Sequence, residues 1–250
     1  MFSYSDFELS KDLQNFEYDH YLVKTGKAGK LCSAIGIKAL MVGTMCWQAV
    51  YNLYKWTLVE HSRALTSWAL LLTFFHVALS LKCSIDTEIS KKRRYLIANH
   101  IVAEVTLPIN LVVTIVYWLL LWEECLIKYG NDPTLLFHTI VIHSLPMALT
   151  VLNFCVTDIV FKKAHALSFF VIGLVYGYHN YSQTMSMGEP VYWFLPWDGS
   201  GSSTLTIGGL SLGCAIFFVS VAGLTRKVRT FRPKVPDRSN DHETDNAKKV

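Results

Sequence analysis

Apolar residues along this chain are gathered into long blocks that are separated by short polar segments. The blocks are roughly 20 residues long, which is the length of helix that crosses the hydrocarbon core of a bilayer. The pattern therefore predicts a series of helices that each span a membrane. We expect six such spans, over residues 33–53, 64–82, 97–122, 134–156, 165–187 and 203–225.

The composition supports this interpretation and narrows the fold class. Of the 250 residues, 52% are hydrophobic and only 17% are charged, whereas charged residues make up about a quarter of a typical soluble domain. The acidic start of the chain has neither a basic segment nor an apolar stretch of the kind found in cleaved signal peptides. We predict an all-α, polytopic six-helix membrane bundle whose first span is an uncleaved anchor.

Clusters of basic residues mark every second connection between the predicted spans. The positive-inside rule places such connections in the cytoplasm, together with both termini. Because these clusters account for most of the net charge of +4, the charge indicates orientation and not a nucleic-acid partner. The basic segments are 24–30, 91–94, 162–163 and 226–232, and acidic residues lie in the intervening connections at 123–132 and 189–198.

The same pattern divides the chain into three parts. Residues 1–32 are predicted to be a cytoplasmic segment, 33–225 the transmembrane domain and 226–250 a disordered cytoplasmic tail rich in polar residues. The six cysteines show no metal-binding spacing, and we interpret them as small apolar fillers. No metal and no cofactor is predicted.

Polar residues inside the predicted spans carry most of the functional information, because such groups are costly in a membrane. Taken one at a time, each can simply bond to a neighbouring helix. The depths expected for Thr66, His138, His143 and His179 indicate a polar pocket in the outer half of the bundle, whereas Glu104 is expected nearer the inner side. The polar residues within the spans are Thr66, His76, His100, Glu104, Asn110, His138, His143, Asn153, His179 and Asn180.

Two of these histidines share the fourth predicted span but not the same direction. His138 and His143 are five positions apart, which on an α-helix separates them by roughly 140°. At most one of them therefore faces a given pocket. Pro146 follows closely and removes a backbone hydrogen bond from the helix.

Two kinds of chemistry fit these residues. A threonine hydroxyl beside a histidine base is a nucleophile–base pair that can attack an acyl carbonyl. His100 and Glu104 lie one helical turn apart and can form a structural pair, a proton path or part of a metal site. Two ligands are fewer than the three that catalytic zinc takes from a protein, so the metal interpretation is not adopted.

Several motifs resemble those of the androgen-induced / rolling stone superfamily of multi-pass membrane proteins. They are LTSW at 65–68, LPINLVVTIVYW at 107–118, HSLPMALTVLN at 143–153 and GLVYGYHNYSQTMSMGEPVYWFLPW at 173–197. Their order and spacing carry the resemblance, which covers most of residues 60–225.

The resemblance implies a hydrolase of fatty acid esters of hydroxy fatty acids that takes its lipid substrate from the bilayer. It implies Thr66 as the nucleophile and His143 as its base, with His138 as the alternative base if the alignment is anchored on Pro146. Asn153 stands where these hydrolases have an acid. Asn180, His179 and Tyr178 are candidate donors to the oxyanion, and Glu104 is a further candidate supporting residue.

Two other functions remain open from the sequence. Rolling stone proteins are linked to cell fusion, which implies a non-catalytic role in adhesion, fusion or scaffolding. A proton-coupled transporter centred on Glu104 is the third hypothesis. A multi-pass protein of the endoplasmic reticulum or plasma membrane fits all three, and the sequence fixes neither the substrate nor the oligomeric state.

Overall fold

The structure is a computed structural model that describes residues 28–55, 62–86, 92–156 and 161–230, and within these ranges it contains only helices and their connections. The predicted all-α class is therefore confirmed. The elements are α3 (Ala28–Lys55), α5 (Leu65–Ile85), α7 (Arg93–Val116), the π-helical turn η2 (Tyr117–Leu121), α8 (Trp122–Tyr129), α9 (Pro133–Val156), the 3₁₀ turn η3 (Lys163–Leu167), α10 (Ser168–Met187) and α11 (Ser202–Thr230).

Each of the six predicted apolar segments coincides with one of the long helical stretches. Four stretches, Leu65–Ile85, Arg94–Tyr129, Pro133–Phe154 and Ser202–Thr225, are long and apolar enough to cross a membrane, which is consistent with a multi-pass membrane protein. The other two, α3 and α10, are 28 and 20 residues long and are not among these four stretches. Of the predicted disordered tail at 226–250, residues 226–230 instead continue α11, and the remainder lies outside the described residues, as does most of the predicted N-terminal segment 1–32.

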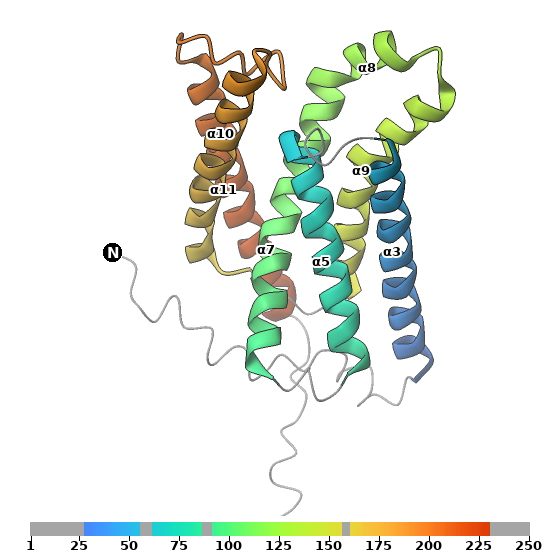
Figure 1. Cartoon of the computed structure of the whole chain (residues 1–250). Coiled ribbons are helices and arrows are strands. Elements are labelled where there is room, and N and C mark those ends of the chain that lie inside the picture. The colour runs from blue at the N-terminus through green and yellow to red at the C-terminus, as the bar shows by residue number, and fades with distance from the viewer. Residues whose placement is uncertain (1–27, 56–61, 87–91, 157–160, 231–250) are drawn as a thin grey trace, which may run out of the picture.

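Helix α7 occupies the middle of the bundle (Figure 1). It packs against α5 and α9 on one side and against α11 on the other, while α3 covers α5 and α10 pairs with α11. Two apolar cores result. One joins α7 to α10 and α11 around the fully buried Phe218, and the other joins α3, α5 and α9 around Met41 and Val77.

A buried amide links the three central helices at mid-height. The Asn110 side chain of α7 donates hydrogen bonds to Thr73 Oγ1 of α5 at 2.7 Å and to Thr150 Oγ1 of α9 at 2.9 Å. Both hydroxyls also bond to carbonyls of their own helices. Side-chain hydrogen bonds between membrane helices average about 0.6 kcal/mol each, so the two bonds of this amide contribute about 1 kcal/mol and also fix the register of the three helices.

The loop after α10 closes the upper end of the bundle. Gly188 ends the helix in the left-handed conformation, with φ 75°, and its N–H bonds to the carbonyl of Thr184. Glycine adopts this conformation without the steric cost that a Cβ would add. The chain can therefore turn back so that Tyr192 lies against the first turn of α5.

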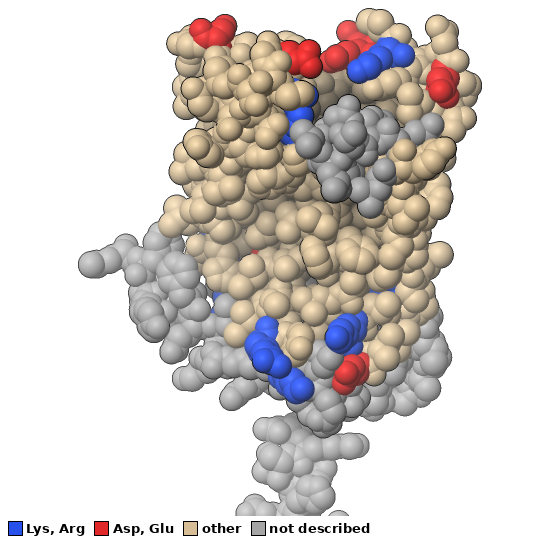
Figure 2. All heavy atoms as spheres, in the orientation of Figure 1, with Lys and Arg blue, Asp and Glu red and all other residues tan. Residues whose placement is uncertain are grey.

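Charge is distributed unevenly over the face shown in Figure 2. Most of its acidic residues lie at the upper end, its lower end carries mainly basic ones, and a broad uncharged belt separates the two. Large apolar side chains are exposed along the helices, among them Leu71, Phe75 and Leu174. This distribution is typical of a surface that faces lipid in its middle and water at both ends.

Candidate active site

An apolar cavity of about 70 Å³ lies between the α5–α7–α9 group and the α10–α11 pair. Isoleucine, valine, leucine and phenylalanine make up most of its walls. Its few polar side chains include Thr66 from α5, His143 from α9 and Tyr176 from α10, together with Tyr192 from the loop after α10. The structure thus brings the predicted nucleophile and the predicted base to one cavity.

Thr66 is the second residue of α5 and is almost fully buried. The first N–H groups of a helix have no carbonyl partner within it and form the positive end of its dipole. One of them, the N–H of Leu65, donates to the Tyr192 hydroxyl at 3.1 Å. The Tyr192 hydroxyl also interacts with the Thr66 side chain, so the threonine is held between a helix N-terminus and a phenol.

Burial raises the pKa of Tyr192, and its interactions with Tyr176, the Leu65 N–H and Thr66 offset the rise only in part. The residue lies in the loop outside the helices. A phenol with a raised pKa keeps its proton well above neutral pH. Tyr192 can therefore serve as a hydrogen-bond donor to a group bound in the cavity.

A second layer of hydrogen bonds supports the tyrosines. The Tyr176 hydroxyl donates to the Arg63 carbonyl at 3.3 Å and accepts from the Asn180 amide at 3.4 Å. The Asn180 carbonyl oxygen accepts from Trp197 Nε1 at 2.7 Å. Among the described residues, Asn180, predicted as an oxyanion donor, does not line the cavity itself but bonds to Tyr176, which does.

The imidazole of His143 is fixed in position and tautomer. Its Nδ1 donates to the Thr139 carbonyl at 2.6 Å, and a neutral ring then carries an unprotonated Nε2 that can accept a proton. The ring stacks on Tyr117, with centroids 4.1 Å apart and planes 9° from parallel. Tyr117 is the first residue of the π-helical turn, a feature often found at functional sites.

Thr66 and His143 line the same cavity but are not bonded to each other. In the part of the chain that the structure describes, the hydrogen bonds of His143 run to Thr139 and Thr114. The Thr66 side chain lies beside Tyr192. A molecule bound in the cavity would therefore have to bring the hydroxyl and the imidazole into contact.

His138 points to the other side of α9, as the 140° separation predicts. It bonds through Nε2 to Asn52 Oδ1 at 3.0 Å and through Nδ1 to the Gln48 amide at 3.3 Å, and its ring packs on Tyr51. All three partners belong to α3. His138 is buried and is not among the residues that line the Thr66 cavity.

Two predicted supporting residues have partners other than His143. The Asn153 amide bonds to His76 Nε2, and its carbonyl oxygen accepts from Ser80 Oγ at 3.2 Å. His179 Nε2 bonds to the Ser62 carbonyl at 2.9 Å. Neither Asn153 nor His179 is part of the cavity wall in the described structure.

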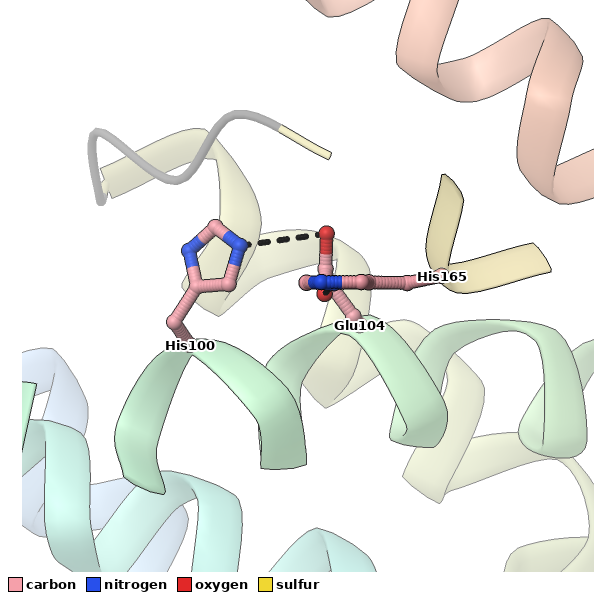
Figure 3. A group of neighbouring side chains, drawn as sticks. All are labelled: His100, Glu104 and His165. Carbon is pink, nitrogen blue, oxygen red and sulfur yellow. Dashed lines mark hydrogen bonds and ion pairs between the residues drawn. The ribbon is translucent and has the colours of Figure 1, made fainter. Parts of the chain in front are cut away.

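Glu104 belongs to a separate cluster below the cavity. As the sequence predicts, it pairs with His100 one turn earlier on α7. His165 of η3 approaches the same carboxylate from the opposite side (Figure 3). These three side chains are the candidate metal ligands among the described residues.

Sequence reasoning did not single out several residues that complete these groups. Three of them are buried polar residues of the first predicted span, whose apolar mean hydropathy drew attention away from single polar positions. They are Lys38, Gln48 and Asn52. Tyr117, His165 and Tyr192 acquire their roles through contacts with distant segments. Their aromatic or imidazole character was visible in the sequence, but their partners were not.

Comparison with protein-family models, curated proteins and solved structures gives no match for this chain.

Proposed function

We propose that the chain is an intramembrane hydrolase of lipid esters, with Thr66 as nucleophile and His143 as general base. The observation that carries the proposal is the convergence of these two side chains on one apolar cavity. The proposal includes six membrane spans with both termini in the cytoplasm, and a location in the endoplasmic reticulum or plasma membrane. It also follows the resemblance to androgen-induced hydrolases, including fatty acid esters of hydroxy fatty acids as the substrate class.

The reaction begins when the Thr66 Oγ attacks the ester carbonyl carbon and its proton passes to His143 Nε2. The tetrahedral intermediate collapses, the bond to the alcohol oxygen breaks, and that oxygen takes the proton from the imidazolium. Water, deprotonated by His143, then attacks the carbonyl carbon of the acyl-threonine, and the bond to the Thr66 Oγ breaks as that oxygen takes the proton back from the imidazolium. The hydroxyl–imidazole hydrogen bond that this needs forms with substrate present, because such bonds are often long in the free enzyme.

The negative charge of the tetrahedral intermediate needs hydrogen-bond donors at the site. Tyr192 is one, since its hydroxyl lies beside Thr66 and remains protonated. The N-terminus of α5 is the other, since Thr66 lies in its first turn. In this proposal Tyr192 takes the role that the sequence had suggested for Asn180 or His179.

The cavity matches the reacting part of a lipid and not the whole molecule. A volume of about 70 Å³ is about that of two to three water molecules, which is enough for an ester group. The acyl chains would remain in the surrounding hydrocarbon or along the apolar wall. The site therefore selects esters that arrive from within the bilayer.

A non-catalytic role related to that of rolling stone proteins is the second candidate. It is favoured by one observation, namely that the Thr66 side chain lies beside Tyr192 and is not bonded to either histidine of α9. In that case the cavity is a packing defect between two helix groups. The experiment below separates the two candidates.

Ester hydrolysis by the purified full-length protein, with a branched fatty acid ester as substrate, tests the proposal. Thr66→Ala should remove the activity, while Thr66→Ser should retain part of it because the hydroxyl remains. Thr206→Ala is the matched control, since Thr206 is a half-buried residue of α11 that does not line the cavity and its hydroxyl donates to the Ser202 carbonyl of the same helix. Equal activity in Thr66→Ala and Thr206→Ala would refute the proposed mechanism.

A further inference from the structure

The strongest feature outside the proposed active site is the cluster of His100, Glu104 and His165. His100 Nε2 lies 3.1 Å from Glu104 Oε1, and His165 Nδ1 contacts Glu104 Oε2. One ligand atom from each residue can be chosen so that all three lie within 4.8 Å of one another. The Glu104 carboxylate therefore lies between the two imidazoles (Figure 3).

The cluster has the donor set of a known kind of metal site. Two imidazoles and one carboxylate, with a fourth position left for water or another ligand, form a zinc site in several hydrolases. Ligand atoms around tetrahedral zinc are about 3.4 Å apart, given bond lengths of roughly 2.0–2.1 Å. A modest contraction from the present spacing would bring all three into coordination distance.

Burial makes an uncompensated carboxylate costly at this position. Glu104 is 2% exposed, His100 1% and His165 15%. A carboxylate in so dry a setting requires positive charge or several donors nearby. A divalent cation held by two neutral imidazoles supplies that charge at one point.

Backbone and side-chain bonds around the cluster hold the ligands in place. The N–H of Lys162 donates to Glu104 Oε1 at 2.7 Å, which orients the carboxylate. The Ser168 hydroxyl donates to the His165 carbonyl at 2.6 Å, which fixes the turn that carries the imidazole. Outer bonds of this kind are typical of metal sites and help to set their affinity.

The position of the cluster also suggests a role for the ion. His100 and Glu104 belong to α7, whereas His165 lies in the turn that leads into α10 and packs against α11. A shared ion would therefore tie the central helix to the α10–α11 pair. These are the two helix groups between which the Thr66 cavity lies.

We propose that His100, Glu104 and His165 bind one divalent transition-metal ion, with zinc as the best match to the ligands. The site clamps α7 to the segment that leads into α10. This proposal does not depend on the hydrolase assignment, because none of its ligands lines the Thr66 cavity. His165 is the third ligand, which the sequence alone did not identify.

The test measures zinc on the full-length protein, purified without a histidine tag and stripped with a chelator. After equilibration with zinc chloride and removal of free metal, wild type should retain one zinc per chain and show a higher melting temperature than its stripped form. Glu104→Gln and His165→Ala should bind zinc at least about 100-fold more weakly, since even outer-shell changes cost 10–100-fold. His179→Ala is the control histidine and should behave as wild type.

Two results would overturn the proposal. The first is that the wild-type protein retains no zinc. This result can be interpreted without any variant. The second is zinc retention and thermal stabilisation that are the same in wild type, Glu104→Gln and His165→Ala. X-ray absorption of the wild-type zinc form gives an independent reading, because it should show nitrogen and oxygen ligands, including imidazole, and no sulfur.

Discussion

The Thr66 cavity and the His100–Glu104–His165 cluster differ in how their polar groups are satisfied. In the cavity, Thr66 and His143 face a shared apolar space and leave each other unbonded. In the cluster, both imidazoles and a backbone N–H converge on one carboxylate. The first arrangement leaves reactive groups open to a bound molecule, whereas the second gathers donors around a single point and is suited to holding an ion.

The two histidines of α9 provide the largest expected contrast. His143→Ala should lower kcat for ester hydrolysis by about 10²–10⁴-fold, because it removes the general base. His138→Ala should change kcat by only a few-fold, since His138 bonds to α3 and not to the cavity. Steady-state kinetics on the two purified variants measures the difference, and a larger loss in His138→Ala would reverse the choice of base.

Removing the Tyr192 hydroxyl should produce the next largest effect. Tyr192→Phe keeps the ring but loses the oxyanion donor, and loss of one such donor typically lowers kcat by about 10²–10³-fold with KM little changed. Because burial raises the pKa of its phenol, the donor keeps its proton throughout the neutral range. Tyr181→Phe is the control, since the Tyr181 ring packs on Trp197 outside the cavity. Matching kcat values for Tyr192→Phe and Tyr181→Phe would exclude Tyr192 as the donor.

Asn110 should matter for stability and not for chemistry. Asn110→Ala should lower the free energy of unfolding by about 1–2 kcal/mol, because it removes bonds to two neighbouring helices while both threonine hydroxyls keep partners of their own. Reversible unfolding in mixed micelles measures this. The control Ser220→Ala, whose exposed hydroxyl bonds within α11, should change stability by less than about 0.5 kcal/mol. A stability loss no larger than that of the control would contradict the role given to Asn110.

The smallest effect is expected where α10 and α11 approach most closely. A Cβ on Gly173 would lie 1.9 Å from Ser211 Oγ and 3.1 Å from Ser211 Cβ. Gly173→Ala should therefore cost about 1 kcal/mol of unfolding free energy. The cost should be smaller in a Ser211→Ala background, where the nearest atom is absent. A double-mutant cycle with no coupling would show that the two helices can separate at little cost.

The sequence predicted the positions of the helices well, because each long apolar block indicates the position of one helix. Each predicted segment coincides with a long helical stretch, and the opposite directions of His138 and His143 follow from helical geometry alone. Hydropathy was less informative about polar residues within a block. Lys38 is fully buried and its Nζ donates to Ser84 Oγ at 2.5 Å. The hydropathy of its segment is apolar on average, so the hydropathy pattern did not single out this residue.

The sequence could not predict partners that come from distant segments. The resemblance places Asn153 where the hydrolases have an acid, but in the structure its side chain contacts His76 of α5. His165 stands at the start of a predicted span, and only the packing of η3 against α7 brings it to Glu104. The role of Tyr192 depends on the reversal of the chain at Gly188. Such contacts are set by how helices and loops pack together, which local pattern does not encode.

Identification of the nucleophile is the most direct test of the central claim. The full-length protein should be treated with a fluorophosphonate probe, digested and mapped by mass spectrometry. We expect the adduct on the peptide that contains Thr66, and we expect Thr66→Ala to lose it while Thr206→Ala keeps it. An adduct on another residue, or labelling that is unchanged in Thr66→Ala, would contradict the assignment of Thr66 as the catalytic nucleophile.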